Sequence, residues 1–167
     1  TISDFDALVS RFGPDPSALS GVIRIVASST PAEYLVPALI SEFAQEHTGI
    51  SVEVLVADSA QVARTLGDRQ ADLGLSGMPS SSVGYSSIAM AKDEVVLAVS
   101  ANHKFADLRS ITIDQLRDEN IIEREGGSGT WQTVVQALSA AGVELPEHKV
   151  SMTLGSTQAV IAAVGQN

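Results

Sequence analysis

The chain has 167 residues, of which 44% are hydrophobic and 18% charged, and this composition indicates a folded globular protein rather than a disordered one. Ten lysines and arginines against twenty aspartates and glutamates give a net charge of −10, which argues against a nucleic-acid-binding surface on this segment. The absence of cysteine excludes disulfides and thiolate metal sites, and no apolar run approaches the roughly 18 residues of a membrane span.

The first half of the chain alternates predicted strands and helices. Apolar residues at every second position predict strands, and apolar residues at helical spacing predict helices. Thr30 is expected to cap the first helix, because Pro31 suits the first helical position and Glu33 can complete a capping box. The expected elements are a strand at 21–27, a helix from Thr30 to Phe43, a strand at 51–57, a short helix capped by Asp58 or Ser59, and a strand at 71–75.

Residues 85–100 are expected to be extended, as one strand or two, and the alternation then starts again. Strands that alternate with helices indicate an α/β protein with mostly parallel sheets. Two such successions predict two sheets and therefore two lobes. The expected elements of the second half are a short helix capped by Thr112, a strand at 120–124, a helix containing Trp131 and ended by Gly142, a strand at 149–154, and a helix that begins at Ser156-Thr157.

Small hydroxyl residues and glycines follow most of the predicted strands. Ligands of open α/β sheets bind beyond the carboxyl ends of the strands, where helix N-termini offer N–H groups to anions. Serine and threonine are also ordinary helix caps and glycine an ordinary turn residue, so one such loop does not identify a site. As a set, the loops predict a shared anion site, with Arg124 as its fixed positive charge or as an exposed ion pair. The predicted ligand-binding residues are Ser28, Ser29, Thr30, Ser76, Gly77, Ser128, Gly129, Thr130, Ser156 and Thr157.

Sequence motifs for common enzymatic chemistry are missing. There is no P-loop and no G-x-G-x-x-G, and the glycine-rich stretch at 126–129 continues with Thr130 where a nucleophile elbow requires glycine. His47, His103 and His148 are scattered and lack the spacing of metal ligands. We therefore expect no catalytic residue, no metal and no cofactor.

Several segments resemble the effector-binding domain of LysR-type transcriptional regulators. The early ones are the strand that ends in Ala27-Ser28-Ser29, the helix that contains Pro37, Gly49 before the second strand, and the ADLGL stretch at 71–75. DEVVLAVSANHKFADLRSITIDQL, IIEREGGSGTWQTVVQALSAAGV and LGSTQAVIAAV are similar to its later segments. The likeness covers roughly residues 21–164, and its specificity lies in the ordered series rather than in one motif.

The resemblance implies a periplasmic-binding-protein type II-like α/β fold, in which two Rossmann-like lobes enclose a ligand cleft. Residues 1–20 are then expected to be the end of an upstream linker helix and a linker, 21–95 lobe I and 96–167 lobe II. The resemblance also implies an upstream winged helix-turn-helix and a chain that continues beyond Asn167 to complete lobe I. The family's effector contacts carry over to the ligand-binding residues named above as far as their motifs match.

These features predict an effector-sensing regulatory domain that binds a small anion, either an inorganic oxyanion such as sulfate or a small carboxylate. The expected partners are this ligand, a second copy of the chain, and DNA through the upstream domain alone. Residues 33–46 are either the dimer helix or a helix that packs on its own sheet. We expect a cytoplasmic protein without membrane contact. The alternative is the solute-binding protein of an ABC transporter for phosphate, sulfate or molybdate, and an upstream secretion signal would favour it.

Overall fold

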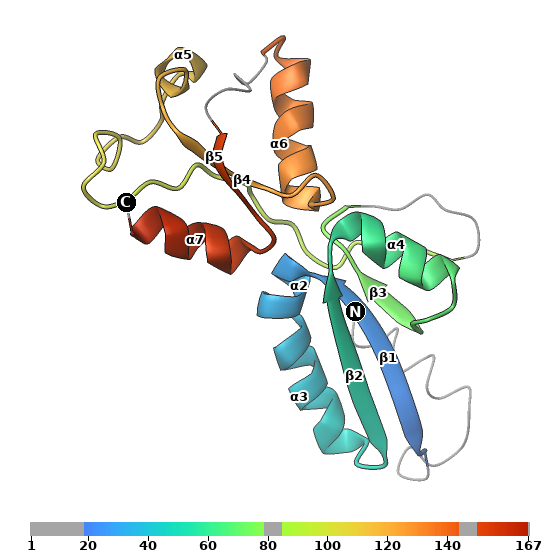
Figure 1. Cartoon of the computed structure of the whole chain (residues 1–167). Coiled ribbons are helices and arrows are strands. Elements are labelled where there is room, and N and C mark those ends of the chain that lie inside the picture. Colours follow the sequence, from blue (N-terminus) through green and yellow to red (C-terminus); the bar gives the residue numbers. More distant parts are fainter. Residues whose placement is uncertain (1–18, 79–84, 144–149, 167) are drawn as a thin grey trace. The chain divides into compact units, whose positions relative to one another are not determined.

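The computed structural model describes residues 19–78, 85–143 and 150–166. The described residues up to Lys92 form one compact unit, called unit 1 below, and those from Asp93 form a second, called unit 2 (Figure 1). Each unit combines parallel strands with helices, so the predicted α/β class is confirmed. The expected linker helix in residues 1–20 lies outside the described residues, apart from its last two positions.

Unit 1 is built on a parallel sheet with the strand order β2-β1-β3. The central strand β1 (Gly21–Ser28) pairs with β2 (Ile50–Ala57) along its whole length and with β3 (Leu73–Leu75) near its end. Val26 and Ala27 of β1 are fully buried, as expected for a strand with neighbours on both sides. The third strand is shorter than predicted because the Asp72 carboxylate, 2.8 Å away, accepts the N–H of Arg24 in place of a backbone carbonyl.

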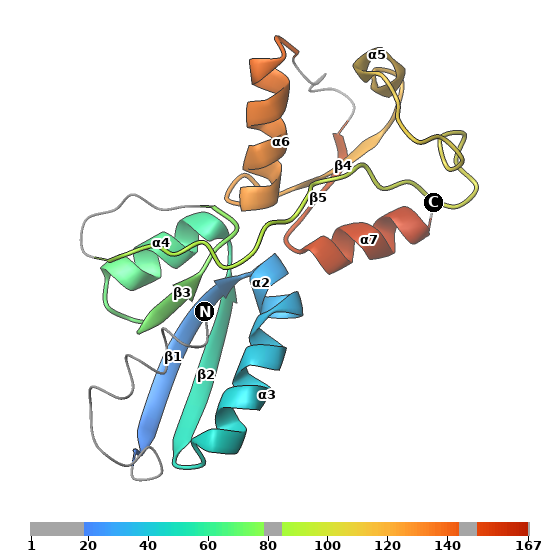
Figure 2. The same cartoon turned by 180° about the vertical axis from the view of Figure 1, so that it is seen from behind.

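The helices of unit 1 start at or near the carboxyl ends of its strands. They are α2 (Ser29–Tyr34), α3 (Val36–Glu46) and α4 (Ser59–Gly67). Helix α3 contacts β2, whereas α4 contacts β1 and β3 (Figure 1 and Figure 2). Of the two predicted caps of α4, Asp58 is the one observed, because its Oδ1 accepts the N–H of Gln61 at 2.7 Å, whereas Ser59 is the first residue of the helix.

The first helix differs from the prediction in two ways. It begins at Ser29 and not after Thr30, so the expectation that Thr30 is the N-cap is wrong: the extended residue before the helix is Ser28. The predicted single helix is also divided at Leu35 into α2 and α3. Pro37 lies in the first turn of α3, and a proline cannot donate to the carbonyl four residues earlier, so an uninterrupted helix would be broken at this point.

Unit 2 contains the parallel pair β4 (Ile121–Arg124) and β5 (Val150–Leu154), as predicted. Its helices are α5 (Ile113–Leu116), α6 (Gly129–Ala140) and α7 (Thr157–Gly165). Helix α6 ends in a Schellman arrangement, because Val143 N–H donates to the Leu138 carbonyl at 2.9 Å and Gly142 N–H to that of Ser139 at 3.0 Å. Gly142 has a φ of +70°, which explains why glycine occupies this position.

Residues 85–100 form no strand, and the expectation of one or two strands there is wrong. The segment is irregular throughout and exposes large apolar side chains, such as Ile88 and Val96. A strand needs a neighbour that accepts and donates its backbone hydrogen bonds, and among the described residues no strand pairs with this segment. No helix in the described parts of the chain is long and apolar enough to cross a bilayer.

Gly49 lies in the turn before β2, where the backbone of Leu19 passes very close. A Cβ at this position would overlap the carbonyl oxygen of Leu19. We expect Gly49→Ala to lower the free energy of unfolding by about 1–3 kcal/mol, because a backbone oxygen cannot move aside as a side chain can. Gly67→Ala is the matched control, since its Cβ would meet open space at the end of α4. Equal denaturation midpoints for the two variants would contradict this packing.

Glu119 of unit 2 is held by two basic residues. Lys104 pairs with its carboxylate, and His103 Nε2 lies 3.3 Å from Oε2. Because His103 Nδ1 accepts the N–H of Phe105 at 3.3 Å, the neutral ring carries its proton on Nε2 and donates it to Glu119. The hydrogen bond from Lys104 is the largest of the effects that lower the pKa of Glu119, against the opposing effect of burial.

A carboxylate with a lowered pKa stabilises the folded state above its unfolded pKa and loses this contribution as the pH falls through the folded value. Glu119→Gln should therefore lower the melting temperature at pH 7. The difference from wild type should shrink as the pH falls below the ordinary glutamate pKa and disappear once the carboxylate of the folded wild type is protonated as well. Asp118→Asn, at the exposed neighbouring position, is the control and should shift the melting temperature little at either pH. A Glu119→Gln deficit that persists in acid would show that charge is not its cause.

Candidate functional site

In unit 1, the predicted ligand-binding residues lie at the carboxyl edge of the sheet. Ser28 ends β1 and Ser29 begins α2, and both are buried. The N–H of Gly77, which follows β3, donates to Ser28 Oγ at 3.2 Å. The parallel register of Ala27 beside Leu75 explains how residues 49 positions apart in sequence meet here. The structure therefore brings Ser28 and Gly77 together.

Two further predicted residues of unit 1 are Ser76, after β3, and Thr30, in α2. Ser76 is exposed and its Oγ accepts the N–H of Met78 at 3.2 Å, so its hydroxyl orders the local turn. Thr30 is half-buried in the first turn of α2. Ser59, which follows the second strand, is also buried at this edge, although the sequence alone did not favour it as a ligand residue.

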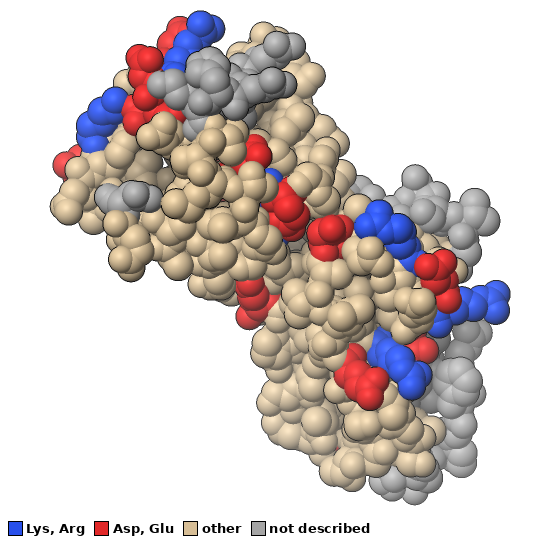
Figure 3. All heavy atoms as spheres, viewed as in Figure 1, with Lys and Arg blue, Asp and Glu red and all other residues tan. Residues whose placement is uncertain are grey.

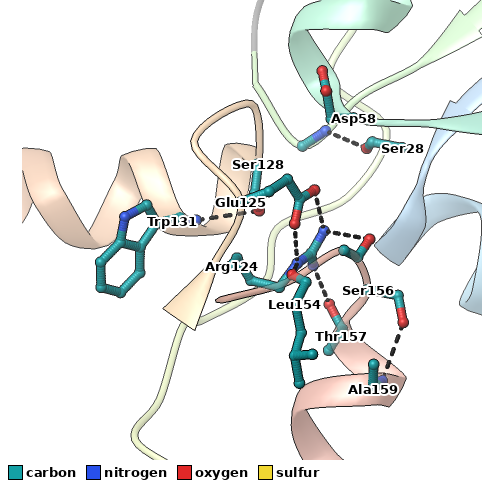
Figure 4. Close-up of polar contacts among 12 residues, drawn as sticks. Ser28, Asp58, Arg124, Glu125, Ser128, Trp131, Leu154, Ser156, Thr157 and Ala159 are labelled. Atoms are coloured by element: carbon teal, nitrogen blue, oxygen red, sulfur yellow. Dashed lines mark hydrogen bonds and ion pairs between the residues drawn. The ribbon is translucent and has the colours of Figure 1, made fainter. Parts of the chain in front are cut away.

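In unit 2, two serines cap the helices that follow the strands. Ser128 Oγ accepts the N–H of Trp131 at 3.4 Å at the start of α6, and Ser156 Oγ accepts the N–H of Ala159 at 3.1 Å at the start of α7 (Figure 4). Each hydroxyl oxygen uses a lone pair for its cap and keeps its hydrogen for donation. Ser128 is 3% exposed, so this cap is a buried part of the fold.

In the first turn of α6, two of the backbone amides lack an acceptor in the described part of the chain. Trp131 N–H is capped by Ser128, and Gln132 N–H donates to the Ser128 carbonyl at 3.0 Å. The amides of Gly129 and Thr130 have no acceptor among the described residues. The glycine-rich stretch is therefore a tight turn, closed by Ser128 N–H and the Glu125 carbonyl at 2.9 Å, which also leaves donors at a helix N-terminus.

Arg124 is the residue whose place in the site was not settled from the sequence. The alternative of an exposed ion pair is wrong in one respect: Arg124 has an ion pair, but the residue is only 6% exposed. Its guanidinium pairs with Glu125 at 2.8 Å, contacts Thr157 Oγ1 at 2.9 Å and donates to the carbonyl of Leu154 at 3.2 Å (Figure 4). An arginine that ends a strand between two glutamates gave no signal for this burial, which depends on acceptors about 30 residues further along the chain.

The chemistry of these groups is donation of hydrogen bonds. Within the described ranges, no three His, Asp or Glu residues cluster in a way that could hold a metal ion. The hydroxyls, glycine amides and helix starts at the carboxyl edge of each unit are suited to oxygen acceptors on a ligand. Both units thus carry the polar edge that is typical of a ligand-binding α/β protein.

Comparison with known families identifies the chain. The family model described as the LysR substrate binding domain matches residues 16–167. The chain therefore belongs to the LysR substrate-binding domain family, and its fold is the periplasmic-binding-protein type II-like fold of these domains. It is the effector-binding domain of a LysR-type regulator.

The relatives agree with this assignment. The chain is 34% identical over 146 residues to the uncharacterized HTH-type transcriptional regulator MJ0300 of Methanocaldococcus jannaschii, a match that covers 87% of this chain and 49% of that protein. It is similar to the effector binding domain of QuiR in complex with shikimate, with a TM-score of 0.76 and 19% identity over 87% of this chain and 69% of that one. It is also similar to the CcmR regulatory domain of Synechocystis PCC6803 in complex with 2-PG, with a TM-score of 0.65, 25% identity and coverage of 87% and 68%.

The chain spans about half the length of the curated relatives it matches, such as MJ0300. It covers 29% of another relative. Those relatives are mostly described as transcriptional regulators. The family membership thus applies to this domain alone and does not extend to the rest of the regulator.

Ser128→Ala should lower the free energy of unfolding by about 1 kcal/mol, because alanine cannot accept the N–H of Trp131 at the N-cap. Ser139→Ala makes the same chemical change at an exposed position inside α6 and should be neutral or slightly stabilising. Chemical denaturation of both variants measures the difference. Equal stability would show that Ser128 does not cap α6.

Proposed function

We propose that this domain senses a small anionic ligand and thereby controls DNA binding by the regulator to which it belongs. The single observation that carries the proposal is the polar edge of unit 2, where Ser128 and Ser156 keep hydroxyl hydrogens and α6 keeps two amides. Ser28 and Gly77 form a corresponding polar edge in unit 1.

The donor-rich surroundings favour an anion. A helix N-terminus contributes about 0.3–1 kcal/mol to binding a negative charge at an exposed site, so several converging termini are needed for useful affinity. An acidic protein can bind an anion in this way, because the local dipoles act at short range while its net charge of −10 is spread over the molecule. The ligand-binding residues in this proposal are the set predicted from the sequence: Ser28, Ser29, Thr30, Ser76, Gly77, Ser128, Gly129, Thr130, Ser156 and Thr157.

The ligands of the related structures support a small, polar effector. QuiR is described in complex with shikimate, which is a carboxylate, and CcmR in complex with 2-PG. We infer a small carboxylate or oxyanion for this chain, and ligand binding that shifts the protein between two arrangements of different DNA affinity. Most of these relatives are described as transcriptional regulators, and we propose no catalytic activity.

DNA contact, dimerisation and location belong to the whole protein. On the face in Figure 3, lysine and arginine side chains are interspersed with aspartate and glutamate and do not form one basic surface. We therefore assign DNA binding to a winged helix-turn-helix elsewhere in the regulator. We propose a homodimer, and a cytoplasmic location because the regulator acts on DNA.

A melting-temperature panel of small carboxylates and oxyanions tests the proposal, because a ligand that binds only the folded state raises its stability. Ser156→Asn and Ser156→Asp both keep an N-cap acceptor, but only aspartate adds a negative charge beside the ligand. We expect at least one anion to stabilise the wild-type domain, and its stabilising effect to be smaller in Ser156→Asp than in Ser156→Asn.

The matched control is Thr112→Asp, which adds the same charge at the N-cap of α5 in the same unit. It should leave the ligand-induced shift unchanged. Failure of every anion to stabilise the wild-type domain, or equal shifts in the two Ser156 variants, would contradict an anion site at this edge.

A further inference from the structure

The Arg124–Glu125 ion pair lies between the two helix starts of unit 2. Arg124 Nη2 is 2.8 Å from Glu125 Oε1, and Nε is 2.9 Å from Oε2, so the carboxylate accepts two parallel bonds from the guanidinium. The side chain of Arg124 is 7% exposed and that of Glu125 is 28% exposed. This bidentate geometry is the one in which arginine binds a carboxylate most specifically. Glu125 thus occupies the place that a ligand carboxylate would take on this arginine.

The other contacts of Arg124 connect the ends of the two strands. Nη1 donates to Thr157 Oγ1 at 2.9 Å, and Nη2 lies 3.4 Å from the Gly155 carbonyl. The backbone carbonyl of Glu125 accepts the N–H of Ser128. The ion pair is therefore attached to the start of α7 through Arg124 and to the start of α6 through Glu125. Arg124 is a positioning residue for both starts, and its charge is matched within the pair.

The pairing determines how the site responds to ligand charge. The Coulomb energy of a fixed charge with a ligand is proportional to the ligand charge, so an unpaired Arg124 would attract a dianion about twice as strongly as a monoanion. A paired Arg124 contributes much less, because Glu125 at a similar distance opposes it. The remaining attraction comes from hydroxyls and amide dipoles, which are short-ranged.

We infer that Glu125 is a charge-selectivity residue of the ligand site. By neutralising Arg124, it removes most of the extra attraction that this arginine would exert on multiply charged anions. The site is thereby adapted to a monoanion such as a monocarboxylate. The inference rests on the proposed function, because it concerns the ligand bound at the same edge of unit 2. It narrows the ligand class from anions in general to those of low charge.

Sulfate and methanesulfonate are suitable probes, because both are tetrahedral and fully ionised near neutral pH but differ by one charge. Their affinities can be measured by NMR titration at a constant ionic strength of about 0.15 M, where exposed charges are screened within about 8 Å, following the amides of Ser128, Gly129 and Thr130. In Glu125→Gln, the amide oxygen can still accept from Arg124 while the negative charge is lost. We expect the ratio of sulfate affinity to methanesulfonate affinity to rise by about three- to tenfold over wild type.

Glu123→Gln is the control, since it removes the same charge from β4, two residues before Glu125, at a side chain whose Oε1 accepts a hydrogen bond from Thr153 Oγ1. Its affinity ratio should stay within about twofold of wild type, because charge removed farther from the site is largely screened. The inference is overturned if both probes shift these amides and the ratio in Glu125→Gln equals that of wild type.

The double variant Arg124→Gln/Glu125→Gln keeps the test decisive if Glu125→Gln does not fold. With both charges removed, the ratio should return to the wild-type value. If the ratio of sulfate affinity to methanesulfonate affinity in the double variant fell tenfold below the wild-type value, Arg124 would attract the ligand in spite of its pairing with Glu125. This result would overturn the inference. If neither probe shifts the amides of Ser128, Gly129 and Thr130 in any protein, the proposed anion site itself fails and the selectivity fails with it.

Discussion

Parallel strand pairing is the constraint on which the rest of this protein depends. In both units the paired strands run in the same direction, so their carboxyl ends meet at one edge of the sheet. Every loop that follows such a strand leaves from that edge, and most of these loops begin a helix. Short polar residues that are far apart in the sequence are thereby collected in one place, as Ser28 and Gly77 are.

The collected residues act first in folding. Ser128 and Ser156 cap helices, Ser28 accepts an amide from the neighbouring loop, and Arg124 joins the ends of β4 and β5. Satisfying these groups internally leaves a limited set of donors, namely hydroxyl hydrogens and first-turn amides. The same residues thus stabilise the edge and define what it can bind, because an N-cap serine that accepts from its helix can still donate to a ligand.

The positive charge at the carboxyl edge of unit 2 is balanced by a neighbouring carboxylate. The buried arginine of unit 2 is matched by Glu125, and the cluster of His103, Lys104 and Glu119 is a second example of a carboxylate held by basic neighbours. A buried charge is tolerated only when it is paired and hydrogen-bonded, which is why Arg124 has contacts to a carboxylate, a hydroxyl and carbonyls at the same time. In the site that we propose, affinity comes from oriented dipoles and ligand preference from the compensating carboxylate.

The sequence by itself determined the α/β class, most of the strands and helices, a cap at Asp58 or Ser59, the helix start at Ser156-Thr157, and the family. These features depend on local periodicity and capping chemistry, which act over a few residues. The division of the first helix at Leu35 has a local cause in Pro37. Tertiary structure decided the irregular backbone of residues 85–100 and the burial of Arg124. Each of these is a matter of partners: a strand exists only beside another strand, and a guanidinium is buried only where distant acceptors surround it. Such partners are supplied by residues far along the chain, and no local pattern records their approach.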